Sequence, residues 1–86
     1  MPEICRFCGI VVQMYADDHV PPHFHARYAG REAAIAIDAH LVLSGSLPPR
    51  ALALTIKWSA SHTRELMADW ELAKARLPLS KIAPLD

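Results

Sequence analysis

The sequence predicts an α+β fold, in which a small antiparallel β-meander of about four or five short strands (residues 4–44) precedes a long or kinked C-terminal helix (residues 47–76) packed on the sheet. Three observations support this. β-branched and aromatic residues concentrate in the first half of the chain, between turn-forming residues. No Gly or Pro interrupts the chain between Arg50 and Arg76. A chain of 86 residues has room for one core, so we expect a single domain over 1–86.

The first half divides into short strands at its turn signals. Residues 4–15 form two short segments, with a bend or bulge at Gly9. Residues 17–22 form a loop, because Asp favours turns and the two prolines cannot donate to a ladder. We expect further strands over 23–28, 32–37 and 41–44, separated by turns at 29–31 and 38–40. The β half therefore covers residues 1–45.

The helical half covers residues 46–77 and an extended tail covers residues 78–86. Pro48 and Pro49 fall in the first helical turn, where their missing N–H groups cost little. A stripe at helical spacing faces the sheet and weakens near Ser59 to His62, so the pattern fits one kinked helix or two helices. The stripe consists of Leu52, Ile56, Thr63, Leu66, Met67, Trp70 and Lys74.

Trp58 and Leu54 fall on a second apolar face of this helix. A helix lying on a sheet uses one stripe, so the second face needs another cover. The C-terminal tail can supply it. Alternatively, the face forms an interface with a partner or in a homodimer, where Trp is a typical anchor.

Composition and charge exclude several classes of protein. An apolar fraction of 52% argues against intrinsic disorder. Nine basic residues balance nine acidic ones, which counts against a broad nucleic-acid-binding surface but allows a small RNA-cleaving pocket. The longest apolar runs are far shorter than a membrane span, and the N-terminal residues do not resemble a signal peptide. With two cysteines, the sequence predicts a reduced cytoplasmic protein without membrane contact.

Three of the five histidines lie within seven residues: His19, His23 and His25. If residues 23–28 form a strand, its period of two places His23, His25 and Arg27 on one face. The intervening residues then point to the core. Asp18 and His19 lie close by, on the preceding loop.

This row favours acid–base chemistry on an anionic substrate. His23 and His25 can act as general acid and base near neutral pH, and Arg27 can stabilise a phosphate transition state, as in RNA cleavage. His19 with Asp18 would be an orienting pair or a further base. Further candidates for substrate contacts are Arg6, Tyr15 and Arg50.

Two other interpretations remain open. His19, His23 and His25 can ligate Zn, Ni or Cu through imidazole nitrogens, in a non-enzymatic module that binds a metal or a partner. The row can also be solvated polar surface. The thiols of Cys5 and Cys8 would point to opposite faces of a strand, so small apolar positions explain them better than a redox motif, although a Cys₂His₂ site stays an alternative.

The sequence resembles the DUF4160 family of small bacterial proteins, on the string Asp18-His19-Val20-Pro21-Pro22-His23-Phe24-His25 and on segments along nearly the whole chain. The further segments are Arg6-Phe7, Gly9-Ile10, Met14-Tyr15, Tyr28, Gly30, Gly45, Leu47 to Leu52, Trp58, Leu66 and Trp70 to Leu72. The resemblance implies the toxin of a type II toxin–antitoxin pair, with an antitoxin of the DUF2442 type as partner. Together with the histidine row, it leads us to expect a ribonuclease toxin, with RNA as the substrate.

Overall fold

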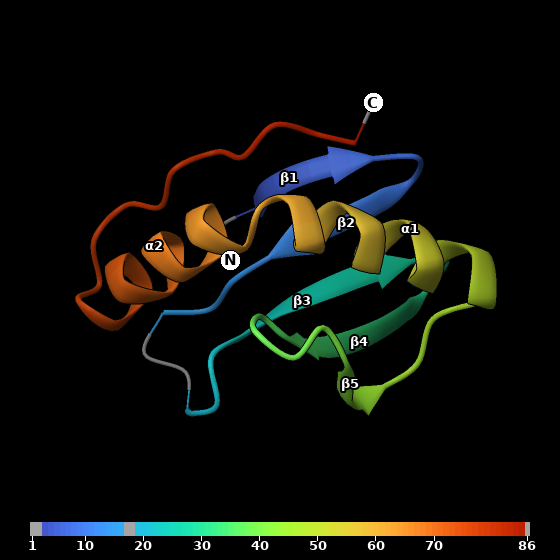
Figure 1. Ribbon diagram of the computed structural model, residues 1–86, viewed down its shortest axis with the longest axis horizontal. Coiled ribbons are helices and arrows are strands. Elements are labelled where there is room, and N and C mark those ends of the chain that lie inside the picture. Colours follow the sequence, from blue (N-terminus) through green and yellow to red (C-terminus); the bar gives the residue numbers. More distant parts are fainter. Residues whose placement is uncertain (1–2, 17–18, 86) are drawn as a thin grey trace.

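The computed structural model describes residues 3–16 and 19–85. They form one five-stranded antiparallel sheet and two helices that lie across one face of it (Figure 1). Strand order in the sheet follows the sequence, so the sheet is a simple meander. The elements are β1 (Glu3–Phe7), β2 (Ile10–Gln13), β3 (His23–Tyr28), β4 (Arg31–Ala36), β5 (Val42–Gly45), α1 (Pro49–Ser61) and α2 (Thr63–Lys74). The predicted α+β fold is confirmed.

Two-residue turns close the β1–β2 and β3–β4 hairpins. Cys8 and Gly9 both have positive φ, 50° and 78°, and so do Ala29 and Gly30, 50° and 80°. Positive φ at both central residues is what a type I′ turn requires, and its twist matches that of the paired strands. These turns fix the register of the sheet, because the residue on each side of a turn must face its counterpart.

The core lies between the sheet and the helices. Phe24 and Ala26 of β3 point into it and are fully buried, as the period-two pattern predicts. Trp58 of α1 is also fully buried, and its ring lies 5.6 Å from that of Phe7 and 5.9 Å from that of Phe24. Trp58 therefore packs against the sheet at the centre of the core.

The helical half consists of two helices, broken at His62. The predicted stripe assumed one helical phase from Leu52 to Lys74. Because the helix breaks at His62, the buried faces of α1 and α2 need not lie on one stripe. In α2 the stripe holds at Leu66 and Trp70, which are buried. In α1 the most buried residues are Ala51, Thr55, Trp58 and Ser59, whereas Leu52 and Ile56 of the predicted stripe are only half-buried. The face that the sequence ranked second is the one that α1 turns to the core.

The C-terminal tail runs back along β1 (Figure 1). The backbone N–H of Ile82 donates to the carbonyl of Ile4 at 2.9 Å, and Lys81 Nζ donates to the carbonyl of Glu3 at 2.7 Å. Ile82 is buried in the core. The tail thus covers the β1 edge of the sheet with the chain's own residues. No helix in the described part of the chain is long and apolar enough to cross a membrane.

Candidate functional site

The histidine row lies on the sheet face opposite the core. His23, His25 and Arg27 alternate along β3 with the buried Phe24 and Ala26. Their cross-strand neighbours on β4 are Ala36, Ala34 and Glu32, respectively. Directly opposed residues on antiparallel strands share a face, so these six positions form one surface. The predicted placement of His23, His25 and Arg27 on one face is confirmed.

His25 and Glu32 form a hydrogen-bonded pair on this surface. The Nδ1 atom of His25 lies 3.1 Å from Oε2 of Glu32. An ionised carboxylate only accepts hydrogen bonds, so the proton of a neutral His25 ring is placed on Nδ1 and the lone pair on Nε2. The His25 side chain is 15% exposed and the Glu32 side chain 41%. The arrangement fixes both the tautomer and the ring orientation of a partly buried histidine.

Glu32 also contacts two further residues of the predicted site. The Tyr15 hydroxyl donates to Oε2 at 3.3 Å, and Nε of Arg27 lies 3.7 Å from Oε1. The Tyr15 ring packs against His25, with ring centroids 4.2 Å apart. Sequence reasoning missed Glu32. The Ala29-Gly30 hairpin turn carried the signal, because a two-residue turn there sets Arg27 opposite Glu32.

His23 lies next to His25 and is held in the same way. Its Nδ1 atom lies 2.7 Å from the Pro21 carbonyl oxygen, which only accepts, so Nδ1 is again the donor. The two imidazole rings meet edge to face at 5.1 Å. Trp70 of α2 packs on the other side of His23, with centroids 5.4 Å apart. The side chain of His23 is buried, so its position is set by packing as well as by the hydrogen bond.

A cavity of about 200 Å³ opens beside His23. It brings His19 of the preceding loop to the same space as His23. The other lining residues are small or apolar: Val20, Pro21, Ala34, Leu43 and Ser44. Asp18, the predicted partner of His19, lies outside the described residues. The structure therefore groups His19 with His23 around the cavity, and His25 with Glu32 beside it.

Gln13 is a second residue that sequence reasoning missed. It is the cross-strand neighbour of His25 on β2, and its side chain is buried. Its Oε1 atom has no hydrogen-bond partner in the part of the chain that the structure describes. A buried acceptor without a donor costs free energy. No spacing in the sequence marks this position, because it depends on the β2–β3 register.

The donor geometry does not favour a preformed metal site. Within residues 3–16 and 19–85, no three His, Cys, Asp or Glu side chains are placed to hold one metal ion. His19, His23 and His25 are thus near one another without converging as ligands. Cys5 is buried in the core, where burial raises the pKa of its thiol, whereas Cys8 is exposed in a turn. The two cysteines do not join the histidines in a Cys₂His₂ site.

The three residues predicted to contact substrate lie in different parts of the structure. Tyr15 belongs to the His25–Glu32 group. Arg6 lies on the same sheet face but on the edge strand β1, where it forms an ion pair with Glu3 at 2.8 Å. This hydrogen-bonded pairing lowers the pKa of the Glu3 carboxyl and raises that of Arg6.

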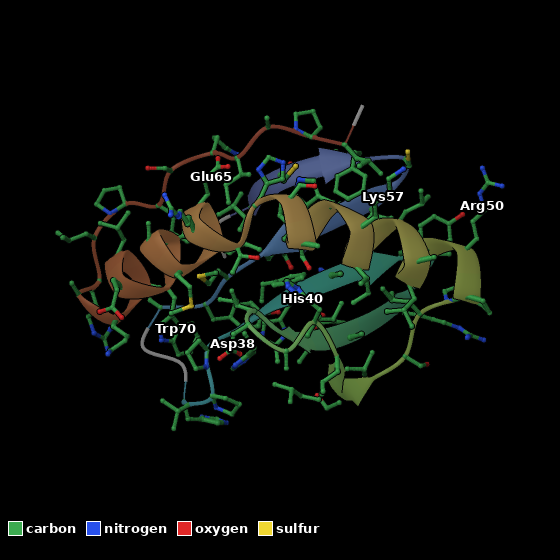
Figure 2. All side chains as sticks on the ribbon, in the orientation of Figure 1. Asp38, His40, Arg50, Lys57, Glu65 and Trp70 are labelled. Atoms are coloured by element: carbon green, nitrogen blue, oxygen red, sulfur yellow. The ribbon has the colours of Figure 1, made fainter. Side chains whose placement is uncertain are left out.

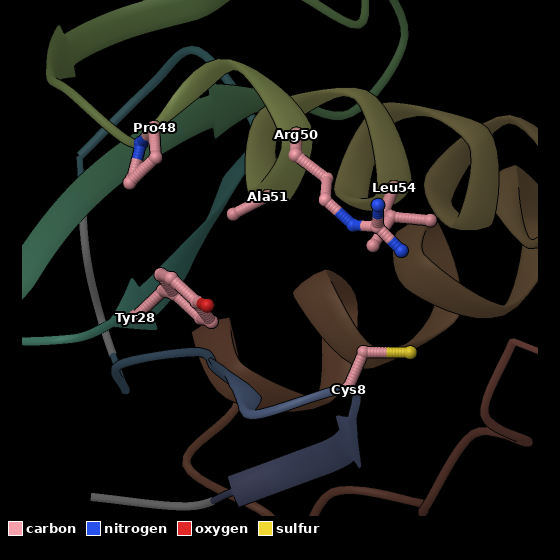
Figure 3. A pocket seen from close by; sticks show the side chains of 6 residues that line it. All are labelled: Cys8, Tyr28, Pro48, Arg50, Ala51 and Leu54. Carbon is pink, nitrogen blue, oxygen red and sulfur yellow. The ribbon is translucent and has the colours of Figure 1, made fainter.

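Arg50 is not brought to the histidine row. It lies on α1 at the end of the molecule opposite Trp70, the residue that contacts His23 (Figure 2). There it borders a separate pocket of about 210 Å³ (Figure 3). That pocket is lined by Cys8, Tyr28, Pro48, Ala51 and Leu54 as well as Arg50. Arg50 starts a helix on the other face of the sheet, so the structure does not bring it to the histidines, and its contact with substrate stays a prediction.

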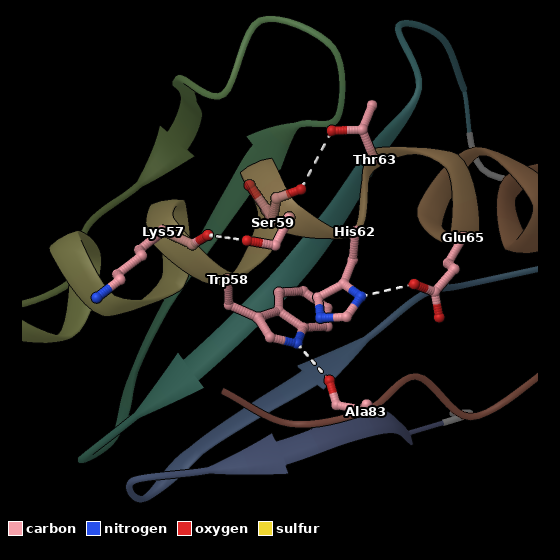
Figure 4. Close-up of polar contacts among 8 residues, drawn as sticks. Lys57, Trp58, Ser59, His62, Thr63, Glu65 and Ala83 are labelled. Carbon is pink, nitrogen blue, oxygen red and sulfur yellow. Dashed lines mark hydrogen bonds and ion pairs between the residues drawn. The ribbon is translucent and has the colours of Figure 1, made fainter. Parts of the chain in front are cut away.

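The Trp58 face is covered by the chain itself. Trp58 Nε1 donates to the Ala83 carbonyl in the tail at 2.8 Å, and the His62 ring packs on Trp58 at 5.4 Å (Figure 4). His62 in turn pairs with Glu65 at 2.6 Å. Of the two alternatives for this face, cover by the tail is the one the structure shows. Leu54 is half-buried beside the Arg50 pocket.

Comparison with known proteins supplies the family. No curated protein and no solved structure matches the chain significantly. One family model, described as a domain of unknown function, DUF4160, matches residues 9–71. The match runs from the β1–β2 turn to α2 and includes the whole histidine row and Glu32. It covers well over half of the sequence, and the chain therefore belongs to the DUF4160 family.

Proposed function

We propose that this protein is the toxin of a type II toxin–antitoxin pair and that it inhibits growth by cleaving RNA at the His23–His25 site. One observation carries the catalytic part of the proposal. Two imidazoles lie 5.1 Å apart, each with Nδ1 hydrogen-bonded to a fixed acceptor, the Pro21 carbonyl or Glu32. A pair of histidines held in defined tautomers is suited to one proton removal and one proton donation.

The chemistry follows from this pair. His25, held by Glu32, accepts the proton of a ribose 2′-hydroxyl through Nε2, while the 2′-oxygen forms a bond to the adjacent phosphorus. The bond from phosphorus to the 5′-oxygen breaks, and a protonated His23 donates its proton to that leaving oxygen. The products are a 2′,3′-cyclic phosphate and a 5′-hydroxyl. Glu32 stabilises the imidazolium that forms on His25.

Charged and polar neighbours support substrate binding at the same face. The Arg27 side chain is about half exposed beside Glu32, where its guanidinium can approach a phosphate. Because the whole chain has no net charge, we expect a short contact with RNA at this site rather than a long basic track.

The toxin role rests on the family resemblance rather than on the geometry. Family membership supports it, and the expected partner is an antitoxin of the DUF2442 type acting in the cytoplasm. This part of the proposal is tested by growth. Induction of the protein without its antitoxin is expected to inhibit growth, and the double variant His23→Ala/His25→Ala is expected to abolish that inhibition.

Arg50→Ala is the matched control for this experiment, because it removes a charged side chain at the far end of the molecule. It should inhibit growth as strongly as the wild type. Circular dichroism of both purified variants checks that the domain remains folded. Undiminished growth inhibition by a folded His23→Ala/His25→Ala protein would show that the histidine row is not the working site.

A further inference from the structure

The two edges of the sheet differ in how they are covered. At the β1 edge, the chain's own tail donates a backbone hydrogen bond from Ile82 to Ile4. At the other edge, β5 pairs only with β4, and no strand of residues 3–16 or 19–85 lies on its far side (Figure 1). Alternate N–H and C=O groups of such an edge strand point away from its one neighbour. They form a row that an extended backbone can pair with.

Exposed apolar side chains gather at the open edge. The described residues include four large apolar side chains that are exposed. Three of them lie at this edge: Val20 (75% exposed), Leu41 (51%) and Leu43 (41%). The fourth, Leu77, follows α2. Val20 and Leu43 line the same cavity, next to His23. The three side chains therefore belong to one region that joins the β5 edge to the cavity.

The edge strand and its flanking residues carry no charged side chain. Residues 41–47 read Leu-Val-Leu-Ser-Gly-Ser-Leu, without a Lys, Arg, Asp or Glu. Edge strands that stay unpaired usually carry an inward-pointing charge or a proline. The register instead shifts between Ala34 and Ile35, so that Leu43 is an extra residue opposite them. This bulge accounts for Leu43 and Ser44 both lining the cavity, although neighbouring residues in a regular strand alternate between faces.

We propose that β5 is a docking edge for a β-strand of another protein, which adds to the sheet as a sixth strand. The occupant is an uncharged, extended segment with apolar side chains at alternate positions. Its backbone meets the outward groups of β5, and its apolar side chains cover Leu41 and Leu43 and enter the cavity beside Val20. An uncharged segment fits because residues 41–47 of this edge contain no charged side chain to pair with.

A second copy of this chain fits the edge less well. β5 has only four residues and contains the bulge at Leu43. Two such strands meeting about a two-fold axis would share a very short ladder and bury far less than the roughly 800 Å² per partner of a stable interface. A longer strand from another protein can extend past β5 along the uncharged residues on either side.

Strand addition at β5 has a consequence for the histidines. The cavity that Val20 and Leu43 line also contains His19 and His23. A side chain of the added strand that enters this cavity therefore closes access to His23. The docking edge itself does not depend on RNA cleavage, because its evidence is the strand order, the exposed apolar side chains and the absence of charge.

Hydrogen–deuterium exchange of the full chain tests the proposal. The probe is an octapeptide of alternating valine and threonine, acetylated and amidated so that it carries no charge. We expect the peptide to slow exchange at the amides of Val42 to Gly45, while exchange in β3 stays unchanged. The same peptide with alternate backbone nitrogens methylated lacks the donors for a ladder and should give no protection.

Two surface variants provide the matched comparison. Leu43→Lys places a charge on the docking edge and should weaken peptide binding by about 10-fold or more. Leu77→Lys makes the same change at the other exposed apolar site and should bind the peptide like the wild type. Absence of protection in β5, or equal binding by Leu43→Lys and wild type, would overturn the proposal. A wild-type dimer by light scattering that Leu43→Lys converts to monomers would overturn it too, in favour of self-association.

Discussion

Nδ1 of His25 lies 3.1 Å from Oε2 of Glu32, on the neighbouring strand of the β3–β4 hairpin. The contact joins the two features that the proposed chemistry needs: an imidazole in a defined tautomer, and a carboxylate that stabilises its charged form. It depends on the hairpin register, which the Ala29-Gly30 turn fixes. The local backbone geometry therefore determines which carboxylate His25 meets.

The first prediction concerns Glu32. Glu32→Gln removes the negative charge beside His25 while nearly preserving the side-chain volume. We expect the single-turnover rate of RNA cleavage to fall by roughly 10- to 100-fold, less than the 10²–10⁴ that an acid–base residue itself typically contributes, because Glu32 acts through His25. Tyr15→Phe removes only the hydroxyl at 3.3 Å and keeps the ring packing on His25, so its effect should be smaller. Equal rates for Glu32→Gln and wild type would contradict the role of this pair.

The second prediction concerns Gly45, at the end of β5. Its φ is +75°, and an added Cβ would lie 2.1 Å from the Glu32 carbonyl oxygen. Gly45→Ala should therefore lower the free energy of unfolding by about 3 kcal/mol or more, from backbone strain and a steric clash together. Gly30 has φ +80° but open space around it, so Gly30→Ala should cost only about 1–2 kcal/mol. Urea unfolding measures the free energy of unfolding of both variants. Equal losses of stability would show that Gly45 does not approach the Glu32 carbonyl as closely as described.

The third prediction concerns the tail. Ile82 is buried in the core, and its backbone N–H reaches Ile4. Ile82→Ala should destabilise the domain by about 2–4 kcal/mol, because it removes buried apolar volume. Leu77→Ala, at an exposed position, should change stability by less than about 0.5 kcal/mol. A neutral Ile82→Ala would mean that the tail does not pack against β1 in solution.

The fourth prediction is a pH dependence of stability. Asp69 of α2 is buried, and burial raises the pKa of its carboxyl, while a hydrogen bond from the Ser80 backbone N–H at 2.8 Å opposes that rise. Its other oxygen has no hydrogen-bond partner among the described residues. Because the pKa of Asp69 is higher in the folded state than in the unfolded state, the folded protein binds more protons than the unfolded chain at pH values between these two pKa values. Stability therefore falls as pH rises from the usual Asp pKa, near 4, to the raised value.

Asp69→Asn tests this sign, because an amide keeps an oxygen that can accept from Ser80 but does not titrate. We expect the variant to gain stability relative to the wild type as pH rises through that window, and to hold the gain at neutral pH. Urea unfolding at a series of pH values measures the difference. A difference that does not change with pH would show that the carboxyl titrates alike in both states.

Strand periodicity made much of the fold and half of the site predictable. The alternation of polar and apolar residues from His23 to Tyr28 predicted the bounds of β3 and the face that points to the core. A strand with one buried face alternates in this way, because successive side chains point to opposite faces. The turns followed from Gly9 and Gly30, whose positive φ favours glycine. These features are local, so the residues that cause them are adjacent in the sequence.

The remainder depends on contacts between distant segments. Gln13 joins the site through the β2–β3 register, which no residue type marks. Glu32 was missed although the Ala29-Gly30 turn sets it opposite Arg27. The buried face of α1 was predicted wrongly because the stripe was drawn through the break at His62. The structure instead turns the Trp58 face to Phe7 and Phe24 of the sheet. The sequence could not place Arg50 relative to the histidines, because its position depends on where α1 crosses the sheet.

RNA cleavage by the purified protein tests the central claim most directly. A short RNA is incubated with wild type and with His25→Ala in the presence of EDTA, and the product ends are identified by mass spectrometry. The account predicts a 2′,3′-cyclic phosphate end from the wild type, no product when the 2′-hydroxyl at the cleaved position is replaced by hydrogen, and a rate about 10²–10⁴-fold lower for His25→Ala. Cleavage that leaves a 5′-phosphate, or that is undiminished in a folded His25→Ala protein, would contradict it.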